Sequence, residues 1–288
     1  MKKLRFAVIG TGFWANFQIP AWMELEGIEL VALYNRTILK AEAIARKFNV
    51  PGVYDDAQKL LENEKLDFVD IITDVDTHNV FTELAAKKGV AVICQKPMAP
   101  KLSIAKEMLA TCEKYKVPFF IHENWRWQAP IRKMKELLNS GVIGNPFKAR
   151  VTFCSAFPVF ENQPFLAELD EFILTDIGSH ILDVCRFLFG EVETLYCHTA
   201  SVNPKIKGED VANVLMKMEN GISCYAEMSY ASILEHEAFP QTFVLVEGEN
   251  GSLNLTEDYA IHITTKEGTN FIKAIPKSYS WLDPEYAL

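Results

Sequence analysis

The sequence has little that would place it in a membrane or on a nucleic acid. Its acidic residues outnumber its basic ones, 38 to 29, and the formal net charge of −9 would repel both DNA and anionic lipid surfaces. No apolar run approaches the roughly 20 residues that a membrane-spanning helix requires. Low-complexity tracts and internal repeats are absent as well. These absences indicate a globular protein with neither a nucleic acid nor a membrane as its partner.

Paired cysteines are also absent. The six cysteines are scattered without a Cys-x-x-Cys pair, and most lie within apolar runs, where a free thiol behaves as a small hydrophobic side chain. The N-terminal stretch MKKLRFAVIGTG has two lysines and a short apolar run, but it lacks a small-residue cleavage site. We therefore expect a cytoplasmic protein with reduced thiols, without a disulfide framework or a structural metal site.

The first half of the sequence has a pattern of alternating strands and helices that is typical of a parallel sheet. Five short apolar runs (LRFAVIG, IELVALY, LDFVDII, VAVIC and VPFFIH) alternate with stretches of helical pattern. Near-continuous apolar strands separated by helices are typical of a sheet that is covered on both faces. Residues 1–122 are therefore predicted to form a doubly wound α/β domain, a dinucleotide-binding Rossmann domain.

The second half has short strand patterns joined by tight turns, such as ENG at 219–221, and helical patterns only at 129–141 and 176–190. This arrangement predicts an α+β domain at 123–288 with a large, mostly antiparallel sheet that binds substrate. So few helices would cover one face only, which leaves the sheet open on the other. We expect the open face to pair with a second copy of the chain, as a homodimer or homotetramer. The apolar residues assigned to this open face are Val214, Met216, Met218, Cys224, Ala226 and Met228.

The stretch IGTGFWA at 9–15 is a G-x-G-x-x-A pattern between the first predicted strand and a helix. Gly10 permits the tight turn, Gly12 lets a pyrophosphate approach the backbone, and Ala15 allows the helix to pack closely. The alternative is an ordinary glycine-rich turn, but the position at the start of a β-α-β pattern favours dinucleotide binding. The residues predicted to contact the cofactor here are Gly10, Thr11, Gly12, Phe13 and Trp14.

Asn35 and Arg36 end the second predicted strand, where an NAD-binding domain ordinarily has an acidic residue on the ribose hydroxyls. A neutral hydrogen-bonding side chain followed by a guanidinium suits a 2′-phosphate, so the sequence favours NADP, with NAD as the second choice. The competing interpretation is that Arg36 stacks on the adenine and selects neither cofactor.

The stretch VICQKPMAP at 92–100 leads an apolar strand into Lys96 and then fixes the backbone with Pro97. An ammonium at the end of a buried strand is costly to desolvate unless its charge is used there. The proline restricts both its own backbone and that of Lys96, so the Lys96 side chain would leave the chain in a fixed direction. The alternative is a strand-to-helix turn with a solvated lysine. Whether the bond before Pro97 is cis is left open.

Asp176, His180 and Asp183 lie at i, i+4 and i+7, on one face of a predicted helix. Acid–base chemistry is one interpretation, because histidine titrates near neutrality and a carboxylate one turn away would orient it. A solvated polar face is the second interpretation, and metal ligation by Asp176 and His180 is the third. No further Cys, His or Glu set completes a metal site, so no metal is predicted.

In this order, the glycine turn, CQKP and DIGSHILD resemble the Gfo/Idh/MocA oxidoreductase family, whose members include glucose–fructose oxidoreductase and inositol dehydrogenase. The similarity extends from about residue 4 to the end of the sequence. It implies that Lys96 lies beside the nicotinamide and the reacting hydroxyl, and that Asp176 and His180 are the family's D-x-x-x-H pair. This sequence departs from the family pattern at Gln95, which replaces a glutamate, and at Asp74, which replaces a proline.

The resemblance implies an NAD(P)-dependent oxidoreductase that transfers hydride between nicotinamide and a secondary hydroxyl or carbonyl of a sugar, polyol or related small molecule. His180 would be the base, Lys96 the electrostatic partner or proton relay, and Asp176 would orient the hydroxyl or His180. The alternatives are an enzyme of this fold that retains its cofactor and cleaves a glycoside, and a non-catalytic cofactor-binding sensor. Further expected cofactor contacts are Thr73, His78, Gln95, Lys96, Trp125 and Arg126. Expected substrate contacts are Lys96, Asn124, Arg126, Asp176 and His180.

Overall fold

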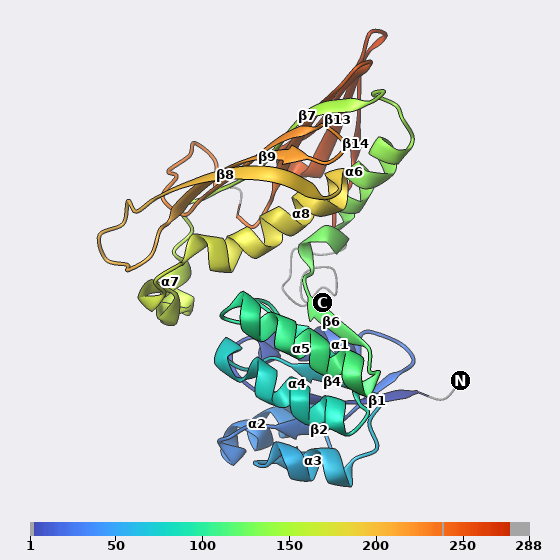
Figure 1. Cartoon of the computed structure of the whole chain (residues 1–288), viewed down its shortest axis with the longest axis vertical. Coiled ribbons are helices and arrows are strands. Elements are labelled where there is room, and N and C mark those ends of the chain that lie inside the picture. Colours follow the sequence, from blue (N-terminus) through green and yellow to red (C-terminus); the bar gives the residue numbers. More distant parts are fainter. Residues whose placement is uncertain (1–2, 238, 277–288) are drawn as a thin grey trace. The chain divides into compact units, whose positions relative to one another are not determined.

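The computed structural model describes residues 3–237 and 239–276, which form two compact units (Figure 1). The first unit contains the described residues up to Glu123, and the second begins at Asn124. The domain boundary predicted between residues 122 and 123 lies one residue from this division.

The first unit is the predicted doubly wound Rossmann fold. Its six strands pair in parallel in the order β3-β2-β1-β4-β5-β6. Along β1, Ala7 and Ile9 join one apolar core while Phe6 and Val8 join another, because successive side chains point to opposite faces. Both faces are thus buried, which explains the near-continuous apolar runs. The strands are β1 (Leu4–Ile9), β2 (Ile28–Tyr34), β3 (Gly52–Tyr54), β4 (Phe68–Ile71), β5 (Ala91–Gln95) and β6 (Phe119–His122). The helices are α1 (Ala15–Met23), α2 (Ile38–Phe48), α3 (Ala57–Asn63), α4 (His78–Lys87) and α5 (Leu102–Tyr115).

The topology of this sheet defines where a ligand would bind. The chain runs outward from β1 on one side through β2 and β3, and on the other side through β4, β5 and β6. In such sheets, ligands occupy the crevice outside the carboxyl ends of the strands at the point where the order reverses. That point lies at the ends of β1 and β4, which pair directly.

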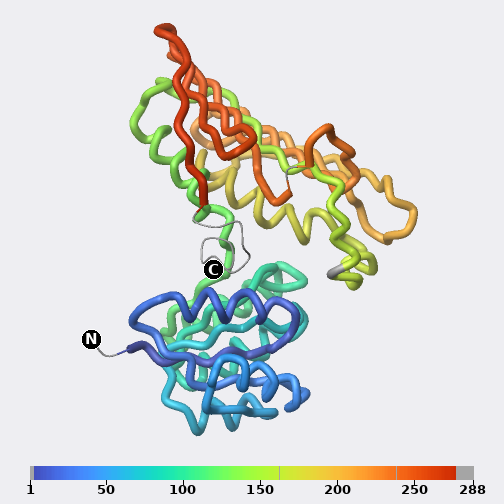
Figure 2. Tube along the Cα trace, turned by 180° about the vertical axis from the view of Figure 1, so that it is seen from behind, coloured from blue at the N-terminus to red at the C-terminus, as the bar shows by residue number. Residues whose placement is uncertain are grey.

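The second unit is the predicted α+β domain. Its eight strands have the order β14-β13-β12-β11-β7-β10-β9-β8, and every neighbouring pair is antiparallel except β7 with β10. Figure 1 shows α6 and α8 along one face of the sheet, and Figure 2 shows its last strands, orange to red, side by side at one end. The helices are α6 (Ala129–Asn139), α7 (Val159–Asn162) and α8 (Ser179–Phe189). The strands are β7 (Pro146–Cys154), β8 (Val192–Ala200), β9 (Val211–Met218), β10 (Ser223–Ser229), β11 (Phe243–Gly248), β12 (Gly251–Leu255), β13 (Ala260–Thr265) and β14 (Gly268–Lys273).

One prediction about this sheet is wrong. The residues assigned to the open face belong to the apolar core instead, together with residues of α8 such as Ile181 and Cys185. Successive side chains of a strand point to opposite faces of the sheet, so the sequence shows which residues share a face. The more apolar of the two groups of residues lies on the face that the helices cover. The open face therefore carries the other set. The residues that are core rather than open face are Val214, Met216, Met218, Cys224, Ala226 and Met228.

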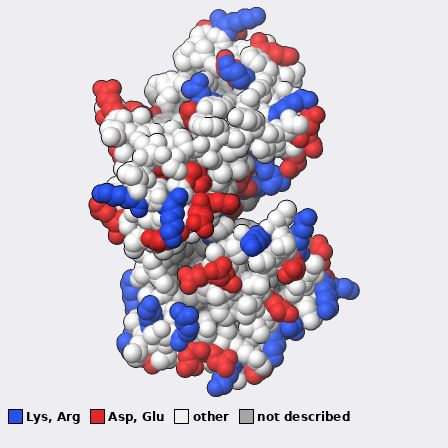
Figure 3. All heavy atoms as spheres, turned by 60° about the vertical axis from the view of Figure 1, so that its left-hand side comes forward, with Lys and Arg blue, Asp and Glu red and all other residues white. Residues whose placement is uncertain are grey.

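No helix in the described part of the chain is both long and apolar enough to cross a membrane. On the face shown in Figure 3, acidic and basic side chains are interspersed among the described residues and form no continuous basic surface.

Candidate active site

The glycine turn connects β1 to α1 and has the backbone geometry that the motif requires. Gly10 has a φ of +114°, and an added Cβ would lie 2.7 Å from the carbonyl oxygen of Ile72, so only glycine fits. Gly12 differs, because a Cβ there would meet no described atom within 4 Å. The backbone at Gly12 is therefore open beside the position of a side chain, which fits a motif whose second glycine lets a pyrophosphate approach the backbone.

Replacing Gly12 by alanine should therefore weaken NADH binding by at least about tenfold without lowering the melting temperature, because the methyl group fills ligand space and contacts no protein atom. Fluorescence titration and thermal unfolding measure the two quantities. Gly10→Ala is the matched contrast, since its clash with Ile72 should lower the melting temperature. Unchanged NADH affinity in Gly12→Ala would refute the assignment of the turn.

Asn35 and Arg36 follow β2 directly, one strand away from the glycine turn. The Asn35 side-chain oxygen accepts a hydrogen bond of 2.8 Å from the backbone N–H of Thr37, just before α2 begins. Asn35 thus shapes the loop, while the Arg36 side chain is exposed. These positions are compatible with either cofactor.

Lys96 follows β5 and is half-buried, and its peptide bond to Pro97 is cis. The neighbouring turn is held by His78, whose Nδ1 lies 3.2 Å from the carbonyl oxygen of Pro97 and whose Nε2 lies 3.1 Å from that of Thr73. Burial lowers the pKa of His78, although the carbonyls of Thr73, Met98 and Pro97 act in the opposite direction. His78 therefore joins the turn after β4 to the turn after β5, and its contact with the cofactor stays a prediction.

Asp176 and His180 lie in different kinds of helix. Asp176 is in a π-helical turn, Leu174–Gly178, whereas His180 is in the first turn of α8. The sequence predicted a single helical face, and the wider turn alters its spacing at Asp176. Single π-helical turns are frequent at functional sites.

The His180 ring stacks on the indole of Trp125, with ring centroids 4.5 Å apart and an interplanar angle of 9°. Trp125 is buried, so the stack fixes the orientation of the imidazole against the core of the second unit. The family resemblance makes Trp125 an expected cofactor contact. The structure shows it supporting His180, and a cofactor contact for Trp125 stays a prediction.

Tyr230 is a residue of this region that the sequence reasoning missed. Its hydroxyl donates a hydrogen bond of 3.5 Å to Oδ2 of Asp176. Burial raises the pKa of Tyr230 well above its usual value, and the Asp176 carboxylate raises it further, so the phenol stays protonated and remains a donor. The available signal was its position as the last residue of the strand pattern ISCYAEMSY at 222–230, and in the structure it follows β10 directly.

Arg126 has its guanidinium on the carboxylate of Asp183, with Nε 2.6 Å from Oδ2 and Nη2 on Oδ1. The family resemblance makes Arg126 an expected contact of both cofactor and substrate. The structure shows the salt bridge, which ties the segment after β6 to α8. Binding of substrate or cofactor by Arg126, and of substrate by Asn124, stays a prediction.

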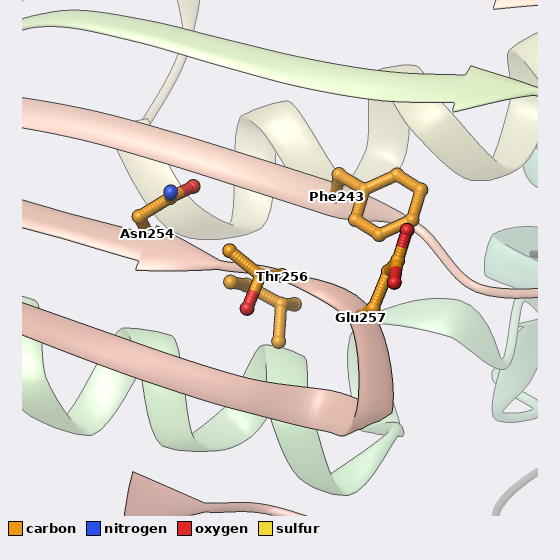
Figure 4. Close-up of a pocket in the computed structure, with 5 residues that line it drawn as sticks. Phe243, Asn254, Thr256 and Glu257 are labelled. Atoms are coloured by element: carbon orange, nitrogen blue, oxygen red, sulfur yellow. The ribbon is translucent and has the colours of Figure 1, made fainter. Parts of the chain in front are cut away.

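A surface depression in the second unit involves none of the predicted site residues. It lies against β11, β12 and the turn that follows β12, as Figure 4 shows. Its lining residues are Phe243, Asn254, Leu255, Thr256 and Glu257.

The fold and the glycine turn define an NAD-binding oxidoreductase of the Rossmann type. The family model described as "Oxidoreductase family, NAD-binding Rossmann fold" matches residues 4–123, and the model of the "GFO/IDH/MocA C-terminal domain" matches residues 131–254. The chain belongs to the Gfo/Idh/MocA oxidoreductase family.

Two curated relatives are similar over nearly the whole chain. A D-apiose dehydrogenase of Paraburkholderia graminis is 44% identical over 281 residues, which are 98% of this chain and 75% of the relative. A D-apiose dehydrogenase of Rhizobium rhizogenes is 42% identical over 98% of this chain and 81% of the relative. Among solved structures, an oxidoreductase from Agrobacterium radiobacter in complex with NAD+, L-tartaric acid and magnesium is 40% identical. It superposes with a TM-score of 0.96 over 99% of this chain and 85% of that protein.

Proposed function

We propose that this protein is an NAD(P)-dependent sugar dehydrogenase that transfers hydride between nicotinamide and a CH–OH group, and that D-apiose is the first substrate to test. The observation that carries the proposal is the 44% identity to a D-apiose dehydrogenase over 98% of the chain. Lys96, Asp176 and His180, the residues that the family resemblance makes catalytic, are all present.

The dinucleotide would be held by the backbone at Gly12 and the N-terminus of α1, where free N–H groups suit a pyrophosphate. A bound dinucleotide would supply the nicotinamide as the acceptor of the hydride that leaves the sugar carbon. Lys96 stabilises the negative charge that develops on the sugar oxygen, and His180 removes its proton. Asp176, held by the Tyr230 hydroxyl, orients the sugar hydroxyl or His180.

Steady-state formation of NADH and of NADPH with D-apiose, compared with a panel of pentoses and polyols, tests this proposal. Turnover with a sugar supports it. If purified protein retains its nicotinamide and shows no net reduction while it cleaves a glycoside, the second hypothesis from the sequence is correct. Cofactor binding without conversion of any carbohydrate would instead support a sensor.

The preference for NADP that the sequence favours is part of this proposal, and it rests on Arg36. The exposed guanidinium at the end of β2 suits a 2′-phosphate. We expect Arg36→Ala to weaken NADPH binding by about tenfold and NADH binding by less than about twofold, since only NADPH loses a charge-assisted contact. Parallel fluorescence titrations measure both affinities. Equal weakening would show that Arg36 stacks on the adenine.

The proposed oligomer uses the open face of the second unit's sheet. Cross-strand pairing brings Tyr196, Leu215 and Tyr225 into one row on β8, β9 and β10. Tyr196 and Leu215 are 68% and 51% exposed, so the row presents a large apolar surface to solvent. A second copy of the same sheet is the occupant that we propose, as a homodimer or homotetramer.

Leu215→Glu should convert this oligomer to a monomer in analytical ultracentrifugation at micromolar concentration, because a two-fold interface would bring two carboxylates into an apolar contact. Leu39→Glu is the matched control, since Leu39 is 67% exposed on α2 of the first unit. A wild-type protein that already sediments as a monomer would contradict the prediction.

A cytoplasmic location completes the proposal. The six cysteines are free thiols, and four of them are buried within the two units: Cys94, Cys112, Cys185 and Cys224. Reduced, packed thiols support the cytoplasm over an oxidising compartment.

A further inference from the structure

A continuous chain of hydrogen bonds leads from the half-buried Gln95, next to Lys96, to fully buried polar side chains, entirely within the first unit. The backbone N–H of Lys96 donates to Oε1 of Gln95 at 2.7 Å, and Nε2 of Gln95 donates to Oε1 of Gln18 at 3.1 Å. Nε2 of Gln18 then donates to Oδ2 of Asp70 at 2.6 Å. Gln18 on α1 and Asp70 on β4 are fully buried, so the chain links the end of β5 to the centre of the sheet.

Asp70 sets the direction of every hydrogen bond in this chain. An ionised carboxylate only accepts, so Gln18 must turn its N–H groups toward Asp70 and its oxygen toward Gln95. Gln95 must then donate to that oxygen, and its own oxygen remains for the N–H of Lys96. The N–H of Trp22 donates to the same Asp70 oxygen at 2.7 Å, which holds the carboxylate in place.

His122 adds a second constraint on the Gln18 amide. Its Nδ1 lies 2.8 Å from Nε2 of Gln18, so the amide donates one N–H to His122 and the other to Asp70. Gln18 therefore has no N–H left for position 95. A glutamate at position 95 would place a carboxylate against the Gln18 oxygen, and neither acceptor would have a donor.

We infer that Gln18 and Asp70 are positioning residues for Lys96, and that this fixed order of donors requires glutamine at position 95. The chain holds the Lys96 backbone where β5 ends, and the Lys96 ammonium is directed from that point. This inference rests on the proposed catalytic role of Lys96. It also gives a physical reason why this sequence departs from the glutamate of the family pattern.

A double-mutant cycle of Gln95→Glu and Asp70→Asn tests the inference. Gln95→Glu should lower the melting temperature by about 3 °C or more, because the buried oxygen of Gln18 loses its donor and faces a carboxylate. It should also lower kcat by about tenfold while the KM for the dinucleotide stays within about twofold, since the glycine turn is untouched. The melting temperature reports the hydrogen bonds, and kcat reports the position of Lys96.

The double variant should recover most of both losses. Gln18 and Trp22 donate to the same oxygen of Asp70, so the cycle is run in a Trp22→Phe background, which removes the second donor. Asparagine at position 70 can then donate its own N–H to the Gln18 oxygen, so the Gln18 amide reverses and donates to the carboxylate introduced at position 95. That carboxylate still accepts from the N–H of Lys96 through its second oxygen. Independent packing defects at positions 70 and 95 would add in the double variant. Recovery of the melting temperature and kcat therefore indicates that the two positions are coupled through the Gln18 amide.

Three results would overturn the inference: a Gln95→Glu variant equal to wild type, losses in the double variant that simply add, or a rescued melting temperature without any change in kcat. Failure of the proposed function is distinguishable, because wild type itself would then convert no sugar. If only the catalytic role of Lys96 is wrong, Lys96→Met would keep the turnover of wild type. The melting temperatures would still report whether Asp70 orders the amides.

Discussion

Replacing Lys96 by methionine should lower kcat for sugar oxidation by about 10²–10³-fold, the range found when one preorganised donor is removed from a developing oxyanion. Methionine keeps an unbranched side chain at the end of β5 but has no charge to stabilise the sugar oxygen. NADH affinity should stay within about threefold, because the glycine turn that carries the phosphates is unaltered. Steady-state kinetics and fluorescence titration of the same preparation measure the two effects.

Lys101→Met is the matched control, because Lys101 is exposed a few residues after Lys96 and carries the same charge. It should have wild-type kcat and affinity. If Lys96→Met loses NADH binding in proportion to kcat, the residue serves the cofactor rather than the chemistry. Wild-type turnover in Lys96→Met would eliminate the mechanism proposed for this lysine.

The parts of this fold that the sequence predicted are those with strong local patterns. Five strands of the first sheet are continuous apolar runs, and the glycine turn has a fixed spacing relative to β1. In the first unit two elements were missed, β3 at Gly52–Tyr54 and α3 at Ala57–Asn63. β3 is only three residues long and half-buried, so it has no period to detect. α3 was overlooked even though Asp56 caps it by accepting from the N–H groups of Gln58 and Lys59.

Pairings between distant segments account for what could not be predicted at the site. The Arg126–Asp183 salt bridge joins residues 57 positions apart, and the Gln95–Gln18 hydrogen bond spans 77 positions. Hydrophobic periodicity says which face a residue occupies but not which polar side chain meets it there. Asp70 illustrates this limit, because in the sequence it only interrupts an apolar strand, whereas its partners lie on α1 and at the end of β6.

Replacing His180 by glutamine should lower kcat by about 10²–10⁴-fold, the contribution expected of a positioned general base. Glutamine retains hydrogen-bonding capacity but does not titrate near neutral pH, so the rise of kcat/KM with pH that a histidine base produces should disappear. A pH–rate profile of the variant beside wild type measures both the loss and the change of shape.

Two variants distinguish the role of His180 as a base from the role of the residues that position His180 and Asp176. Trp125→Phe keeps an aromatic ring against the imidazole, so it should retain the pH profile with a smaller loss of kcat. Tyr230→Phe keeps the aromatic ring that stacks on Phe172 but removes the hydroxyl that donates to Asp176. It should likewise leave the pH dependence of kcat/KM unchanged. If His180→Gln keeps the wild-type pH dependence, the proton is removed by another group. Because Lys96 is the remaining titratable residue of the proposed catalytic set besides Asp176, the profile of Lys96→Met would then identify it or exclude it.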